Sequence, residues 1–184
     1  MIKATTLAAS FLLLLALALP ARAGEALGFF TEWGMTLYAH QSLDTDRDEL
    51  YSAGMGANLA ASLYRLQHAR LDLRLEGQVG PFWHSGHGLE AAVLGGLRAY
   101  LTTCRLQPYL EAGLGPSLNS LNIPETSISF NFLSYGGLGL RWYLGKNQCL
   151  ELGYRLRHIS NGGIKEPNHG VTSHQLQVGL SWAF

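Results

Sequence analysis

Apolar and polar residues alternate along most of this chain with a period of two. From Leu71 to Val79 every odd position is apolar or glycine and every even position is polar. Since successive side chains of a β-strand point to opposite faces, this pattern predicts a strand with one apolar and one polar face. Similar segments predict eight strands in all, over residues 29–38, 53–64, 69–80, 91–101, 109–119, 130–144, 150–160 and 172–184.

The two faces of these predicted strands indicate a membrane protein. Each segment has about the ten residues that a tilted strand needs to cross a bilayer. One face is apolar, as with Trp33, Met35 and Leu37 in the first segment. The opposite faces carry five acids and five arginines, namely Glu32, Asp72, Glu76, Glu111 and Glu151 with Arg74, Arg98, Arg141, Arg155 and Arg157. An apolar exterior around a paired, charged interior predicts an all-β fold, an eight-stranded antiparallel transmembrane β-barrel of the outer membrane.

The predicted connections alternate between longer and shorter ones. The longer ones cover residues 39–52, 81–90, 120–129 and 161–171, and the shorter ones cover 65–68, 102–108 and 145–149. An even number of strands places both termini on one side of the membrane. The termini and the short turns are therefore predicted to face the periplasm, and the long loops the cell exterior.

The first residues are predicted to be a signal peptide. A basic start at Lys3 precedes an almost wholly apolar run over residues 7–19, and Ala21-Arg22-Ala23 has the form of an A-x-A cleavage site. Residues 1–23 would be removed, which leaves 24–184 as one barrel domain in the outer membrane of a Gram-negative bacterium. The mature chain has 11 basic and 13 acidic residues and no basic patch, so nucleic acid is not an expected partner.

Two cysteines, Cys104 and Cys149, fall in predicted periplasmic turns. An oxidising compartment permits a disulfide between them, while two free thiols are the alternative, and the sequence leaves this choice open. Two thiols this far apart without nearby histidines do not make a metal site. No metal and no cofactor are expected.

The candidate chemistry lies at the end of the seventh predicted strand. His158 and Ser160 continue the apolar row that runs through Leu152 and Leu156, so both side chains share the face that should contact lipid. Polar residues facing lipid cost free energy, which favours a functional reason for them. A serine beside a histidine is what a nucleophile with its general base requires, and the apolar surroundings indicate a lipid substrate.

The segment His158-Ile159-Ser160-Asn161-Gly162-Gly163, followed by Pro167-Asn168-x-Gly170, resembles the outer-membrane lipid A 3-O-deacylases of the PagL type. The resemblance implies a serine esterase that removes the 3-O-linked (3-hydroxy)acyl chain from lipid A of lipopolysaccharide. Ser160 would be the nucleophile and His158 its base. Asn161 and the backbone N–H groups around Gly162 would stabilise the oxyanion, and Asn168 would support the loop. The terminal aromatic residue Phe184 is also typical of outer-membrane proteins.

The sequence departs from this family at the third catalytic position. The type members carry a glutamate two residues after the loop glycine, where this chain has Thr172. Three interpretations follow: Glu166 folds back to orient His158, Thr172 or Asn168 acts as a neutral orienting group in a slower enzyme, or the barrel has lost catalysis. Because His158, Ser160 and Asn161 remain together, an active enzyme with a substituted third member is favoured.

Other functions and sites compete with this interpretation. A non-catalytic barrel, structural or adhesin-like, would share the alternation and length, and an acyltransferase would need an acyl pocket inside the barrel. Eight strands are too few for a pore. Weaker site candidates are His84 with His87 as a metal pair, His174 as a neighbour of the site, and the acidic segment 44–49 as a calcium-mediated contact with lipopolysaccharide. The oligomeric state stays open, and a homodimer could build or block the site.

Overall fold

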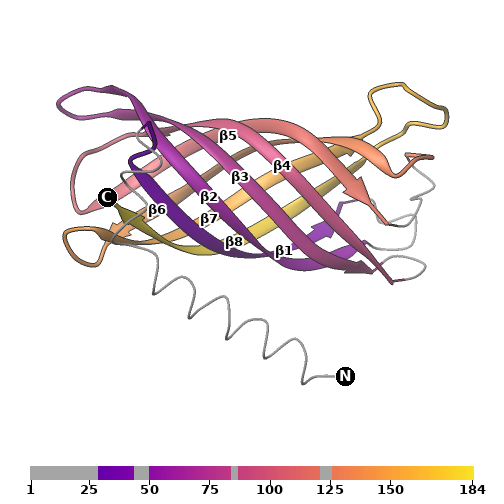
Figure 1. Cartoon of the computed structure of the whole chain (residues 1–184), viewed down its shortest axis with the longest axis horizontal. Helices are drawn as coiled ribbons and strands as arrows, with labels where there is room; N and C mark the ends of the chain where they lie inside the picture. Colours follow the sequence, from indigo (N-terminus) through magenta and orange to yellow (C-terminus); the bar gives the residue numbers. More distant parts are fainter. Residues whose placement is uncertain (1–28, 44–49, 84–86, 121–125) are drawn as a thin grey trace, which may run out of the picture.

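The computed structural model describes residues 29–43, 50–83, 87–120 and 126–184, which form one closed antiparallel barrel with the strands in sequence order (Figure 1). The strands are β1 (Glu32–Ser42), β2 (Tyr51–Arg65), β3 (Arg70–Trp83), β4 (His87–Tyr100), β5 (Leu106–Asn119), β6 (Phe130–Tyr143), β7 (Gln148–Ser160) and β8 (Val171–Ala183). The barrel closes where β1 pairs with β8. Within the described ranges there is no helix long and apolar enough to cross a membrane.

The predicted strands are confirmed, with differences at their ends. The largest concerns the predicted loop 81–90, since β3 continues to Trp83 and β4 begins at His87, and these two residues face each other in the ladder. Glycine and proline around this turn, including Pro81 and Gly88, hide the alternation in the sequence. The predicted signal peptide lies outside the described residues.

The predicted faces of the barrel are also confirmed. Outward-pointing side chains such as Leu37, Val93 and Leu152 are more than half exposed. The ten predicted interior charges are all buried, because their parity along each strand turns them into the barrel. A bulge in β2, between Ser62 and Tyr64, locally shifts its pairing with β3.

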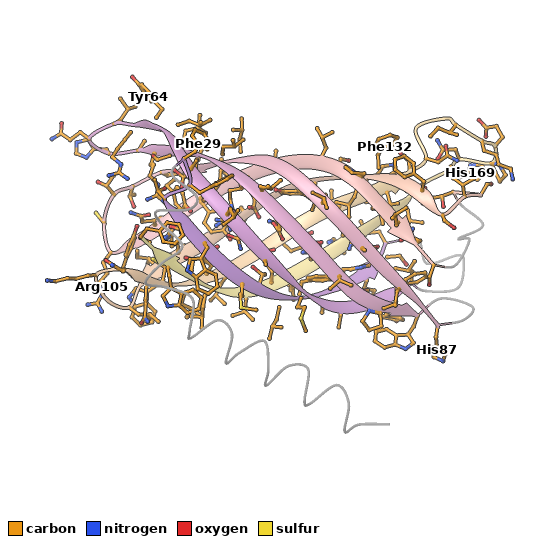
Figure 2. All side chains as sticks on the ribbon, in the orientation of Figure 1. Phe29, Tyr64, His87, Arg105, Phe132 and His169 are labelled. Carbon is orange, nitrogen blue, oxygen red and sulfur yellow. The ribbon has the colours of Figure 1, made fainter. Side chains whose placement is uncertain are left out.

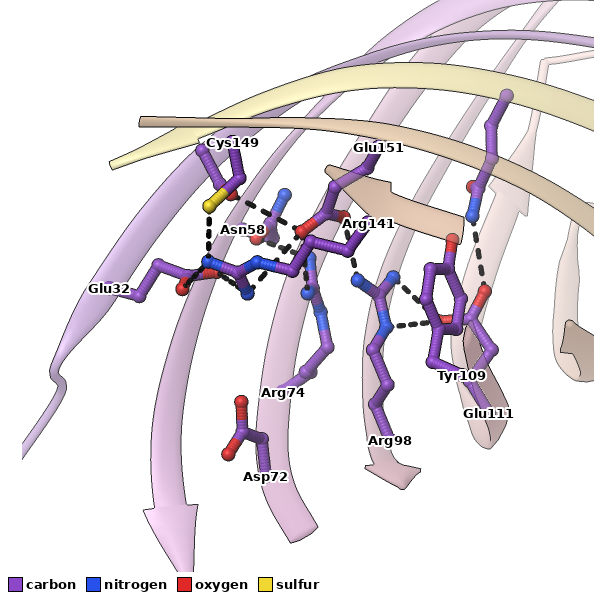
Figure 3. Close-up of polar contacts among 12 residues, drawn as sticks. Glu32, Asn58, Asp72, Arg74, Arg98, Tyr109, Glu111, Arg141, Cys149 and Glu151 are labelled. Carbon is purple, nitrogen blue, oxygen red and sulfur yellow. Dashed lines mark hydrogen bonds and ion pairs between the residues drawn. The ribbon is translucent and has the colours of Figure 1, made fainter. Parts of the chain in front are cut away.

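The buried charges form a connected network across the barrel interior (Figure 3). Arg98 contacts Glu111 at 2.8 Å and Glu151 at 2.6 Å. Arg155 contacts Glu111 at 2.7 Å and Glu76 at 2.8 Å, and Arg141 contacts Glu32. Since each buried charge needs partners from other strands, these contacts fix the strands against one another.

The two cysteines are both free thiols in this structure. Cys149 is fully buried and lies within β7, where Arg141 Nη2 contacts its Sγ at 3.1 Å. The prediction that Cys149 lies in a turn was therefore wrong, because β7 begins one residue earlier and turns this thiol into the barrel. Cys104 is exposed in the connection between β4 and β5.

Candidate active site

His158 and Ser160 lie at the end of β7 on the outward face of the barrel, each half-buried. Ser134 of β6 and Thr172 of β8 stand opposite His158 on its two sides. Ser160 stands opposite Phe132 of β6, whose ring is 41% exposed. Figure 2 shows Phe132 at the same end of the barrel as His169 of the loop that follows β7. The pair thus faces the surrounding lipid at the rim of the barrel.

The imidazole of His158 is held by Thr172. Nδ1 of His158 and Oγ1 of Thr172 are 2.9 Å apart, which is a hydrogen-bond distance. If Nδ1 carries the proton and donates it to Oγ1, the lone pair is left on Nε2, the nitrogen that a general base must offer. The hydroxyl of Ser160 makes no hydrogen bond within the described part of the chain, so it is free to meet a substrate.

Gly170 packs directly against the imidazole of His158. A Cβ added at this position would lie 2.6 Å from Cε1 and 2.7 Å from Nε2 of His158. Its φ of 70° is also in the left-handed region that favours glycine. The glycine of the Pro167-Asn168-x-Gly170 segment therefore leaves the space that the ring of His158 occupies.

The loop after β7 is organised by the side chain of Asn161, which is fully buried. Its Nδ2 donates to the carbonyl oxygens of Thr126 at 2.7 Å and Lys165 at 2.6 Å, and its Oδ1 accepts from the N–H of Gly163 at 2.8 Å. Both amide hydrogens are thus used within the protein. The Asn161 side chain is placed to shape the loop, and a backbone N–H is better placed to meet an oxyanion.

Asn168 and Glu166 lie in the same loop and have different partners. Oδ1 of Asn168 accepts from the backbone N–H of Asn161 at 2.9 Å, which links the two ends of the loop. Oε2 of Glu166 accepts from the backbone N–H of Asn168 at 3.2 Å. The structure therefore brings Thr172 to His158, whereas the carboxylate of Glu166 binds the backbone of its own loop.

The segment before β6 braces this loop, which no sequence motif had indicated. Besides the bond from Asn161 to the carbonyl of Thr126, the hydroxyl of Ser127 donates to the carbonyl of Pro167 at 2.8 Å. Residues 126–127 and 161–170 are far apart in sequence, and each contact joins a side chain to a backbone carbonyl. Such pairing leaves no pattern in the sequence, so only the fold reveals it.

Behind the site, the inward residues of β7 anchor the strand. Arg157 is fully buried and its Nη2 lies 2.5 Å from Oε1 of Glu90 on β4. Ile159 packs with Leu133 and Leu94 in a small apolar cluster inside the barrel. The inward neighbours of His158 and Ser160 are therefore held on both sides of the histidine, which limits how far the pair can move.

The weaker candidates of the sequence fall elsewhere. His174 hydrogen-bonds to the hydroxyl of Tyr154 on the outward face, two residues from Thr172 along β8 toward the membrane centre. His87 lies in β4, whereas His84 and the acidic segment 44–49 are outside the described residues. No group of three or more metal-ligating side chains occurs among the residues that the structure describes.

Comparison with solved structures shows the fold. The crystal structure of the outer membrane enzyme PagL superposes with a TM-score of 0.62 at 20% identity, covering 78% of this chain and 97% of that one. Neisserial surface protein A superposes with a TM-score of 0.60 at 18% identity, covering 83% and 97%. At these identities the likeness establishes an outer-membrane barrel and does not separate an enzyme from a surface protein.

Comparison of sequences identifies the family. Lipid A deacylase PagL of Bordetella bronchiseptica is 30% identical over 145 residues, covering 76% of this chain and 74% of the relative. The protein of the same name from Pseudomonas aeruginosa is 32% identical over 74 residues, covering 39% of this chain and 40% of that relative's length. The family model for lipid A 3-O-deacylase (PagL) matches residues 25–181, and this chain belongs to that family.

Proposed function

We propose that this protein is a serine esterase that removes the 3-O-linked (3-hydroxy)acyl chain from lipid A in the outer membrane. Family membership supports lipid A as the substrate. The observation that carries the mechanism is the contact between Nδ1 of His158 and Oγ1 of Thr172, on the lipid-facing side of the barrel. This contact orients the imidazole of His158 on the same face of β7 as Ser160, two residues further along the strand, and leaves Nε2 without a hydrogen-bond partner among the described residues.

The reaction begins at Ser160. Its Oγ attacks the ester carbonyl carbon of the acyl chain while Nε2 of His158 takes the hydroxyl proton. When the tetrahedral intermediate collapses, the bond to the sugar oxygen breaks and His158 returns the proton to that oxygen. A water molecule, deprotonated by the same imidazole, then attacks the carbonyl carbon of the acyl-serine. The bond between that carbon and Oγ of Ser160 breaks, His158 returns the proton to Oγ, and the fatty acid leaves. No metal takes part in these steps.

Thr172 is the positioning residue in this scheme. Its hydroxyl oxygen accepts a hydrogen bond from Nδ1–H and fixes the ring orientation, as a carboxylate would. Unlike a carboxylate, it carries no charge to stabilise the imidazolium that forms when Ser160 is deprotonated. In a serine protease, loss of the carboxylate function costs about 10⁴ in rate. The enzyme is therefore expected to be slower than family members with glutamate at this position.

We assign the N–H of Gly162 as the hydrogen-bond donor that stabilises the oxyanion of the tetrahedral intermediate. The N–H groups of its neighbours are taken, since that of Asn161 donates to Asn168 and that of Gly163 donates to Asn161. The N–H of Gly162 has no hydrogen-bond partner among the described residues. Its φ of 66° is in the left-handed region, which glycine adopts without strain.

The place of the site on the barrel supports a membrane lipid as substrate. The nucleophile lies at the rim and on the outer surface, with apolar residues such as Leu156 continuing the same face toward the membrane centre. A lipid A molecule in the outer leaflet would place its sugars at the loops and its acyl chains along this face. Paired charges occupy much of the barrel interior in the described residues, which disfavours the apolar acyl pocket that an acyltransferase would need.

The test is mass spectrometry of lipid A incubated with the refolded protein, beside Ser160→Ala and His158→Ala. The expected result is loss of one 3-hydroxyacyl mass with the unaltered chain and no loss with either variant. Ser134→Ala is the matched control, because Ser134 lies on the same outward face opposite His158 and has no assigned role in the reaction.

Two other results would change the conclusion. Loss of an acyl mass that persists in Ser160→Ala would exclude Ser160 as the nucleophile. No reaction with any of the proteins, while a relative with glutamate at the third position is active under the same conditions, would indicate a non-catalytic barrel.

A further inference from the structure

A cavity lies at the end of the barrel opposite the candidate active site, among the short turns. It has a volume of about 570 Å³ and is lined by the ends of β2, β3, β5 and β6 and by two of the connecting turns. Four of the lining residues are cationic, namely Arg65, Arg70, Arg105 and Lys146, and none is an acid. The three short connections, 66–69, 101–105 and 144–147, also contain no Asp or Glu.

Most of this positive charge has no partner. Arg65 and Lys146 are exposed, and neither has an ion pair or side-chain hydrogen bond with any described residue. Arg105 uses only its Nε, which donates to the carbonyl of Tyr143 at 2.9 Å. The cations of the barrel interior are paired with buried acids, so the charge of this cavity is left available to an external anion.

The floor of the cavity is rigid and polar. Arg70 contacts Asp72 at 3.0 Å and lies over the ring of Tyr100 at 4.2 Å, which fixes its guanidinium. Gln107 is only 5% exposed, and its side-chain oxygen has no hydrogen-bond partner within the described part of the chain. That oxygen is an acceptor and would not contact a phosphate, whereas the amide N–H groups of Gln107 can donate to a phosphate oxygen.

Aromatic side chains place this cavity at the depth of lipid headgroups. Tyr64 and Trp142 are 62% and 47% exposed on the outer surface at this end, and Trp33 stacks on Trp182 with ring centroids 4.6 Å apart. Belts of Trp and Tyr mark the membrane–water interface of outer-membrane barrels. Figure 2 shows Tyr64 and Arg105 at the same end of the barrel, so the cations lie near this belt.

We propose that this cavity, the cationic pocket (Arg65, Arg70, Arg105, Lys146 and Gln107), binds the phosphate headgroup of an anionic phospholipid from the periplasmic leaflet. Guanidinium groups bind phosphate oxygens in bidentate geometry, and a lysine adds a point charge. The exposed side chains of Arg65, Arg105 and Lys146 would close on a phosphate that rests against Arg70. This pocket is separate from the proposed active site, and binding there requires no catalysis.

The experiment is native mass spectrometry of the refolded protein in a nonionic detergent, titrated with phosphatidylglycerol or with phosphatidylcholine of the same acyl chains. Lys146→Gln is compared with Lys165→Gln, the same change at the other end of the barrel. One cation near a membrane surface contributes about a fivefold change in affinity. We expect Lys146→Gln to bind phosphatidylglycerol about fivefold more weakly, Arg65→Gln/Arg105→Gln/Lys146→Gln on the order of 100-fold more weakly, and Lys165→Gln without change.

Several outcomes decide the proposal. Equal binding of the two lipids, or equal binding by the triple variant and the unaltered chain, would overturn it. Glycerol 3-phosphate is added as a competitor, and retention of phosphatidylglycerol against an excess of it supports the lipid as the ligand. Displacement at comparable concentrations would assign the pocket to a soluble phosphate instead and overturn the lipid assignment. Heat-modifiable electrophoretic mobility checks that each variant is folded.

Discussion

At the scale of single residues, the contact between Thr172 and His158 separates two tasks that a carboxylate performs together. The hydroxyl 2.9 Å from Nδ1 can orient the imidazole, but it cannot balance the positive charge of the imidazolium. Thr172 therefore occupies the position of the third catalytic residue and keeps its orienting contact, but it lacks the negative charge. Substitution at this one site can therefore measure how much each task contributes to the reaction.

Thr172→Glu is expected to raise the deacylation rate by about tenfold or more, because a carboxylate at this position would stabilise the imidazolium. Thr172→Val is expected to lower the deacylation rate by about 10- to 100-fold, because Nδ1–H of His158 would lose its hydrogen-bond acceptor. Initial rates of lipid A deacylation, followed by mass spectrometry, measure both. An unchanged rate in Thr172→Val would exclude Thr172 as the orienting residue. Glu166, the alternative, would then be tested in the same way with Glu166→Gln.

Gly170→Ala is expected to lower kcat/KM by about 100-fold, because the new Cβ would lie 2.6 Å from Cε1 of His158 and displace the ring. Gly163→Ala is the matched control. Gly163 has a similar left-handed φ of 82°, but a Cβ there would meet nothing within 4 Å. Both variants suffer the same backbone strain, so an equal loss of activity would show that strain, and not the clash with His158, is responsible.

At the scale of elements, the candidate site depends on two loops from different hairpins. The loop between β7 and β8 carries Asn161, Gly162 and Asn168, while residues 126–127, just before β6, hold it through two side-chain-to-carbonyl bonds. The strands fix His158 and Ser160 by register, whereas the proposed oxyanion donor belongs to the loop. Loosening the loop should therefore affect the reaction more than the fold.

Ser127→Ala removes the hydrogen bond to the carbonyl of Pro167 at the loop surface. Because such a bond contributes about 0.5–1.5 kcal/mol, residues 161–170 are expected to exchange their amide hydrogens roughly 2- to 10-fold faster. Hydrogen exchange read by mass spectrometry measures this. Thr102→Ala, which removes an exposed hydroxyl-to-carbonyl bond of 3.1 Å at the opposite end, should leave the exchange of this loop unchanged. Equal protection in Ser127→Ala would show that the brace contributes nothing.

At the scale of the whole molecule, the barrel is held together from inside by charges. Arg98 reaches from β4 to Glu111 on β5 and to Glu151 on β7, and Arg155 connects β7 to β3 and β5. Most apolar side chains of this barrel face lipid, so apolar packing inside is confined to small clusters such as that of Ile159, Leu133 and Leu94. Paired charges fill much of the interior instead. When one member of such a pair is removed, the other stays buried without a partner, which costs free energy of folding.

Arg98→Met is expected to lower the free energy of unfolding by about 3–5 kcal/mol, because Glu111 and Glu151 would remain buried with fewer partners. Urea unfolding of the protein in lipid vesicles, followed by tryptophan fluorescence, measures this. Arg65→Met, at an exposed position without a partner among the described residues, should change the same quantity by less than about 0.5 kcal/mol. Similar values for the two variants would show that the interior network does not stabilise the barrel.

The sequence by itself determined the barrel and the face on which the candidate site lies. Period-two alternation assigns each residue to a face, so Arg98 could be placed inside and Leu37 outside without any coordinates. The same parity put His158 and Ser160 on the lipid face. It could not give the end of β3, since Gly80 and Pro81 interrupt the pattern, nor the place of Cys149, which depends on where β7 begins.

Only the tertiary structure decided which groups meet. Thr172, Glu166 and Asn168 are all close to the motif in sequence, and the register of β7 against β8 selects Thr172 as the partner of His158. The brace from Ser127 and the cationic pocket likewise join segments that are distant in the chain. A face follows from local stereochemistry, which each strand carries in its own residues. A partner follows from how strands are aligned and how loops fold over them, and that is settled only when the barrel closes.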